Sequence, residues 1–227
     1  MNSTRTLVIA VGLILGTQLA FAQDISRYRA YVLESSLESV VAASGARTAD
    51  AKTLHERPAT IQQLEWRAPY VDSRNTLVDP VREISFTFYN DALYQVVVNY
   101  DRDRTEGLTN SDIVESLSTA YGVPTLASAR TRTSPPAEAF TDSIVLARWE
   151  NPEAVVTLVR GSYTPEFQLI VVSKSLAIPA RGAIREATRL DAIEAPRREA
   201  EQRKKEAGDA SAARDKTRIA NKAAFRP

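Results

Sequence analysis

Two stretches of β-forming residues, 84–89 and 92–100, are the strongest structural signal along the chain. They flank Asn90-Asp91, a two-residue connection whose members tolerate a positive φ, and this pattern predicts a β-hairpin. A two-residue turn places Gln95 opposite Phe86 on the face expected to be buried. Because glutamine is unsuited to a core face, we expect a β-bulge or a register shift here.

Two other segments carry apolar residues at helical spacing and have the sequence signals of helix ends. The first follows Ser35, which stands three residues before Glu38 as in a capping box, and ends at Gly45. The second begins after Thr109, a suitable N-cap residue, and ends at Gly122. Each helix precedes a series of β-rich stretches.

The remaining β-rich stretches complete two similar halves. They lie at residues 28–33, 61–66, 126–132, 143–150, 154–160 and 166–173. We therefore expect an α+β fold, with an antiparallel sheet of about seven to eight strands and two helices packed on one of its faces. Each half also has a tryptophan in a strand flanked by charges, Trp66 and Trp149, which is the pattern of an internal duplication.

The first 22 residues have the composition of a cleavable signal peptide. Arg5 precedes an apolar stretch, 7–20, that is too short to cross a bilayer as a helix. We expect cleavage between Ala22 and Gln23, a secreted or periplasmic location, and no transmembrane span in the mature chain. The chain has no cysteine, which excludes disulfides, thiol catalysis and a lipidated cysteine.

The net charge of +1 conceals a difference between two parts of the chain. Residues 23–180 hold 15 Lys and Arg against 20 Asp and Glu, whereas residues 181–227 hold 13 against 8 and have a single aromatic residue. We expect one globular α+β domain, 23–180, followed by a charged helical arm, 181–227. In the arm we expect an amphipathic helix over 182–194, an interruption at Pro196 and disorder after Gly208.

The motifs SSLESVVAASG, LEW, ISFTFYNDALYQVVVNYD and IVESLSTAYGVP, within residues 28–173, resemble those of exported bacterial proteins of uncharacterised function. The units that they form resemble the helix-then-three-strand modules of β-lactamase inhibitory protein and of small outer-membrane assembly lipoproteins. The chain differs from the lipoproteins because it has no cysteine to carry the lipid. The resemblance implies a binding or scaffolding module and supplies no catalytic residue.

The strongest catalytic candidates follow the second strand of the predicted hairpin, at Asp101 and Asp103. Haloacid-dehalogenase-type phosphatases present a nucleophilic and a general-acid aspartate at this spacing. Together with Thr105, the same residues match the first three ligand positions of an EF-hand loop, but Glu106 stands where that loop needs glycine. Because the strand belongs to a hairpin, we expect a solvated turn; a metal-dependent phosphohydrolase and a weak cation site are the alternatives.

The other residue types of catalysis and cofactor binding are sparse. His55 is the only histidine, so a histidine-rich metal site is excluded, and the eight glycines form no phosphate-binding loop. The acidic domain disfavours nucleic-acid binding. We therefore expect no cofactor and no enzymatic activity.

The expected function is binding, with an unknown envelope protein or an anionic polymer as partner; a protein inhibitor is a further alternative. Trp66 and Trp149 have two interpretations, core packing, which average burial favours, and an exposed aromatic contact surface. The candidates in the arm are two apolar and three basic residues. They are Ile184, Leu190, Arg203, Lys204 and Lys205.

Overall fold

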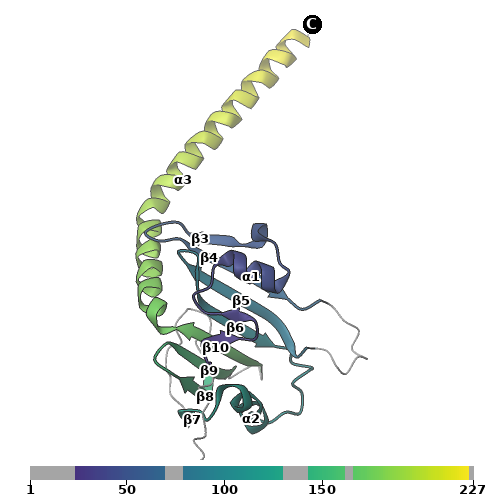
Figure 1. Cartoon of the computed structure of the whole chain (residues 1–227). Coiled ribbons are helices and arrows are strands. Elements are labelled where there is room, and N and C mark those ends of the chain that lie inside the picture. Colours follow the sequence, from purple (N-terminus) through teal and green to yellow (C-terminus); the bar gives the residue numbers. More distant parts are fainter. Residues whose placement is uncertain (1–23, 70–78, 130–142, 162–165, 225–227) are drawn as a thin grey trace, which may run out of the picture.

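The structure, a computed structural model, describes residues 24–69, 79–129, 143–161 and 166–224 (Figure 1). The proposed signal peptide and its cleavage position lie outside these residues. Within the described ranges, no helix combines the length and the apolar character needed to cross a membrane.

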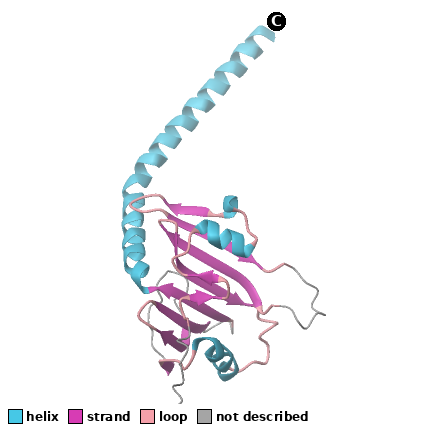
Figure 2. Ribbon diagram, in the orientation of Figure 1, coloured by secondary structure: helices cyan, strands magenta, loops and turns pink. Residues whose placement is uncertain are grey.

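One antiparallel sheet dominates the fold, as predicted, and eight strands of the described residues form it in the order β3-β4-β5-β6-β10-β9-β8-β7 (Figure 2). The strands are β3 (Lys52–His55), β4 (Ile61–Arg67), β5 (Val81–Tyr89), β6 (Ala92–Tyr100), β7 (Leu126–Ala129), β8 (Ser143–Glu150), β9 (Ala154–Gly161) and β10 (Phe167–Ser173). The sequence pattern did not predict β3, which has only four residues and a register irregularity opposite β4.

The strand order is symmetric about the central β6–β10 pair. β3 to β6 form one four-stranded meander, β7 to β10 form another, and the last strands of the two meanders pair with each other. A helix precedes each meander, α1 (Leu37–Ser44) the first and α2 (Asn110–Tyr121) the second. An internal duplication would produce this arrangement.

Both helices pack on one face of the sheet, as predicted. Leu37 and Val40 of α1 and Ile113 and Tyr121 of α2 belong to the same buried apolar cluster as the sheet residues around Phe86. The caps are local. Thr109 and Asp112 form the capping box of α2, whereas the N-cap of α1 is Ser36, one residue later than the pattern predicts.

The β5–β6 hairpin contains the bulge that Gln95 predicts. Asn90 and Asp91 both have positive φ, 48° and 68°, and the register shifts next to the turn so that Thr87, rather than Phe86, pairs with Gln95. The shift places Val96 opposite Phe86 within the core cluster. The hairpin therefore keeps its apolar side continuous and turns Gln95 to the other face.

The segment predicted as one strand over 28–33 is a separate two-stranded hairpin. It consists of β1 (Arg27–Tyr28) and β2 (Tyr31–Val32). Arg29 has a φ of 55°, in the left-handed region, which interrupts the extended backbone.

The last helix, α3 (Lys174–Ala224), corrects the expectation of a break at Pro196 and disorder beyond Gly208, because it continues through both positions. Proline removes one backbone hydrogen bond and kinks a helix, but the hydrogen bonds on either side can continue it. In Figure 1, the first part of α3 runs along the strand ends from β10 towards β3, and the remainder then bends away from the sheet.

The two parts of α3 differ in burial. Ala177, Ala180, Ala183 and Ala187 are buried, and Ala177 packs with Val172 in a second apolar cluster on the face opposite α1 and α2. By contrast, every side chain described over residues 196–223 is exposed. We call residues 196–224 the projecting helix; at about 1.5 Å per residue it is roughly 40 Å long.

Candidate interaction surfaces

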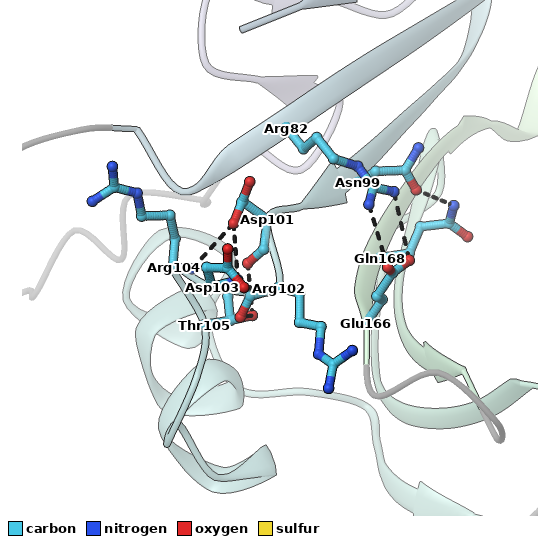
Figure 3. Close-up of polar contacts among 9 residues, drawn as sticks. All are labelled: Arg82, Asn99, Asp101, Arg102, Asp103, Arg104, Thr105, Glu166 and Gln168. Carbon is cyan, nitrogen blue, oxygen red and sulfur yellow. Dashed lines mark hydrogen bonds and ion pairs between the residues drawn. The ribbon is translucent and has the colours of Figure 1, made fainter. Parts of the chain in front are cut away.

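The residues Asp101 to Thr105 form a hydrogen-bonded turn at the end of β6 (Figure 3). The Oδ1 atom of Asp101 accepts hydrogen bonds from the backbone N–H groups of Asp103, at 2.9 Å, and of Arg104, at 3.2 Å. The Thr105 hydroxyl donates to the Asp101 carbonyl oxygen at 2.8 Å. Local side-chain-to-backbone hydrogen bonds of this kind stabilise turns. Asp101 therefore stabilises the turn at the end of β6.

The same turn bears on the cation-site alternative. Thr105 is 6 % exposed, and its hydroxyl donates to the backbone carbonyl oxygens of Asp101 and Arg102 within the turn. Among the described residues, no three His, Cys, Asp or Glu side chains are grouped as metal ligands.

A polar strip beside this turn joins the two halves of the sheet (Figure 3). Asn99 of β6 accepts a hydrogen bond of 2.7 Å from the Nε2 atom of Gln168 in β10. Arg82 of β5 and Glu166, which precedes β10, form an ion pair at 3.3 Å. The Oε1 atom of Gln168 is buried without a hydrogen-bond partner among the described residues, and an unpaired buried acceptor of this kind lowers stability.

The sheet face opposite α1 and α2 has a hollow near the β3 edge, which we call the charged hollow. Its lining residues carry charges of both signs and come from the β3–β4 region. They are Asp50, Lys52, Gln63, Glu65 and Arg67. Arg67 lies 3.5 Å from Glu65 and 3.3 Å from Glu83 of β5.

The register places the charged hollow at the end of a row of side chains that crosses the sheet. Glu65 pairs with Ser85, Ser85 with Val97 and Val97 with Ile170 at the central strand pair. Glu65, Ser85 and Val97 are half-buried, and the lining residues Lys52 and Arg67 are exposed. The row therefore changes from charged at the β3 edge to apolar at the centre of the sheet, where Ile170 is buried in the cluster that Ala177 of α3 joins.

Trp66 and Trp149 both lie on the face covered by the helices. Trp149 is 1 % exposed, and its indole N–H donates a hydrogen bond of 2.7 Å to the Gly122 carbonyl oxygen at the end of α2. Trp66 is half-buried and packs against the same core. Trp149 is therefore unavailable to a partner.

The first part of α3 is held on its own domain. Ile184 and Leu190 are half-buried there. An ion pair fastens the helix to the β3 end of the sheet, where Arg57 contacts Glu194 at 2.9 Å; nearby, the His55 Nδ1 atom lies 3.6 Å from the Oδ2 atom of Asp191. Glu194 lies two residues before Pro196, where the exposed part of the helix begins.

The three basic residues selected from the sequence lie on the projecting helix. Arg203, Lys204 and Lys205 are all exposed. Arg203 forms the i,i+4 ion pair with Glu199, at 3.7 Å. These residues therefore lie far along the chain from the charged hollow and form a second surface.

A cluster of tyrosines shows the largest electrostatic perturbation. Burial raises the pKa of Tyr100 to about 12 and raises the pKa values of Tyr28 and Tyr121 as well. The phenols therefore stay protonated at neutral pH. Next to them, the hydrogen bonds from Arg29 hold the pKa of Asp79 below its ordinary value. The tyrosine pKa values are raised mainly by burial, and the Asp79 pKa is lowered mainly by its pairing with Arg29. Both shifts are therefore consequences of packing and ion pairing in the domain.

Comparisons of the chain with protein-family models, with curated proteins and with solved structures gave no match. The candidate surfaces therefore depend on the geometry alone. Sequence reasoning missed the charged hollow because two of its residues, Asp50 and Lys52, come from the short 3-10 helix η1 (Thr48–Asp50) and from β3. The only available signal was the charge of single residues on a strand too short to be recognised.

Proposed function

We propose that this chain is an exported, non-catalytic binding or scaffold protein that contacts a partner at the charged hollow, on the sheet face opposite α1 and α2, and through the projecting helix. The observation that carries the proposal is the division of the sheet into two unlike faces. One face is packed by α1 and α2, whereas the other is packed near its centre by the start of α3 and carries the charged hollow towards its β3 edge.

The composition of the hollow suits a polar protein surface. Lys52 and Arg67 lie beside Glu65 and Asp50, so charges of both signs are within reach of a partner that offers complementary charges. Complementary charge patterns mainly give specificity and fast association. The proposed partner is therefore a folded envelope protein that matches this pattern.

The non-catalytic part of the proposal is supported by the turn at the end of β6. In the best nucleophile candidate, Asp101, the Oδ1 atom accepts hydrogen bonds from two backbone N–H groups. Thr105 of the same motif bonds to the backbone of its own turn. The candidate nucleophile, Asp101, and Thr105 thus support the turn itself.

Affinity capture with the full chain, lacking only the proposed signal residues, tests the hollow. Glu65→Arg reverses one charge in the hollow. Glu115→Arg makes the same change on the exposed side of α2 and is the matched control. We expect a partner from an envelope extract to be retained by the parent chain and the control and lost by Glu65→Arg.

Two results contradict the proposal. One is a partner captured equally by both variants, because the hollow then contributes nothing. The other is hydrolysis of a phosphate ester in the presence of Mg²⁺ that Asp101→Asn abolishes, because the turn would then be catalytic.

A further inference from the structure

The projecting helix carries most of its positive charge along one side. Residues 197–224 contain nine Lys and Arg against five Asp and Glu. An α-helix advances by about 100° per residue, and on this basis six of the nine basic residues fall within a sector of about 120°. They are Arg197, Arg203, Lys204, Arg214, Arg218 and Lys222, which we call the basic stripe.

The acidic residues of the same helix are largely excluded from that sector. Asp215 alone lies at its border, and it is paired with Arg218 at 3.4 Å. The other four acidic residues lie outside it. They are Glu199, Glu201, Glu206 and Asp209. The stripe thus presents positive charge along one side in two groups, 197–204 and 214–222, whereas the rest of the helix is nearly neutral.

Like charges follow one another along the stripe at the spacing that brings side chains together. Arg214, Arg218 and Lys222 are separated by four residues each, and like charges at i,i+4 destabilise a helix. At Gly208, in the middle of the projecting helix, an added Cβ atom would meet no described atom within 4 Å outside the adjacent helix backbone, so packing does not require glycine there, and glycine lowers helix propensity further. A bound anion that neutralises the stripe would remove the repulsion and stabilise the helix.

The helix lacks the second feature that a membrane-surface helix needs. Ile219 is the single large aliphatic residue between Arg197 and Ala224, and the other apolar residues there are alanines. Interfacial helices bind lipid through a broad apolar face opposite their basic one. The charge pattern without such a face favours a dissolved polyanion over a bilayer.

We propose that the basic stripe binds a linear anionic polymer, which lies along the projecting helix and is held by charge alone. The inference rests on the proposed function as a binding protein and names the partner class of its second surface. The domain, with an excess of acidic residues over 23–180, repels such a polymer and confines it to the helix.

The test measures fluorescence anisotropy of labelled linear polyphosphate and of labelled polyglutamate with the full chain lacking residues 1–22. The stripe variant is Lys204→Gln/Lys222→Gln. The matched control is Lys205→Gln/Lys216→Gln, which removes the same charge from the opposite side of the same helix. Folding is compared by thermal unfolding, which exposed positions of this helix are not expected to shift.

We expect binding at about 50 mM salt that weakens steeply as salt rises, because neutralising contacts release counterions. The stripe variant should bind on the order of tenfold more weakly, and the control less than about threefold. Far-UV circular dichroism should show a gain in helix content when polymer is added to the parent chain. Binding of polyphosphate alone identifies phosphate chemistry; binding of both polymers identifies charge density as the determinant.

Four results overturn the inference: neither polymer binds at low salt; both variants weaken binding equally; anionic phosphatidylglycerol vesicles bind in a stripe-dependent manner while both polymers fail; or the chain self-associates through the stripe instead of binding polymer. None of these depends on Glu65 or on the captured protein. Failure of the polymer interaction is therefore separate from failure of the proposed hollow.

Discussion

Arg57, in the loop between β3 and β4, donates hydrogen bonds to both carboxylate oxygens of Glu194, at 3.2 and 2.9 Å, and so fastens α3 to the edge of the sheet. The contact joins residues 137 positions apart in the chain. It lies just before Pro196, so it marks where the helix stops packing and starts to project.

Glu194→Ala should therefore loosen the end of the docked segment without unfolding the domain. The side chain of Arg57 is well exposed, at 67 %, so the pair contributes at most about 1 kcal/mol to the free energy of unfolding. Hydrogen exchange should accelerate in residues 185–195 and stay unchanged in β10. An equal acceleration in both would show that α3 and the sheet open together.

Removing the projecting helix after Ala195 should leave stability unchanged. The side chains described over 196–223 are exposed and bury little apolar surface on folding, and such burial is the main source of stability. Truncation after Ala180 should lower the midpoint of thermal unfolding, because it removes the buried Ala183 and Ala187. A similar loss in both truncated chains would contradict the division of α3 into two parts.

Trp149→Phe should destabilise the domain by about 2 kcal/mol, since it leaves the Gly122 carbonyl without its indole donor and creates a small cavity. Urea denaturation followed by circular dichroism measures the change. Trp66→Phe is the comparison: its half-buried position predicts a smaller effect. The reverse order of the two effects would contradict the assignment of Trp149 to the core.

Asp101→Ala should cost about 1 kcal/mol because two backbone N–H groups lose their acceptor. Asp101→Asn keeps an oxygen at this position and should cost less. Urea denaturation of the two variants provides the measurement. Equal destabilisation by alanine and asparagine would show that the charge of Asp101, rather than its capping oxygen, matters to the turn.

The Arg29–Asp79 pair predicts a loss of stability in acid. The hydrogen bonds from Arg29 lower the pKa of Asp79 in the folded chain from its ordinary value of 3.8. A lowered pKa means that the pair stabilises the fold above that ordinary value and that this contribution disappears as pH falls through the folded value. Asp79→Asn should therefore be less stable than the parent at neutral pH, and the difference should shrink below about pH 4. A difference that does not change with pH would contradict this.

Local signals were sufficient for much of the fold. The positive φ values that Asn90 and Asp91 tolerate, the capping pair of Thr109 and Asp112 and the misplaced polarity of Gln95 each act over a few residues. The structure has the expected turn, cap and bulge at these positions. The same locality explains the errors: β3 is too short to show a period, and Pro196 is a local stop signal that the surrounding helix overrides.

By itself, the sequence determined the antiparallel α+β sheet, the helices on one face and the separation of an acidic domain from a basic arm, because period, capping and charge are properties of neighbouring residues. Only the tertiary structure decided that β6 pairs with β10, that Asp50, Lys52 and Arg67 line one hollow, and that Arg57 holds Glu194. These relationships join residues across strands or far apart in the chain. They depend on which apolar surfaces are buried together when distant segments of the chain meet, and a pattern of neighbouring residues does not contain that information.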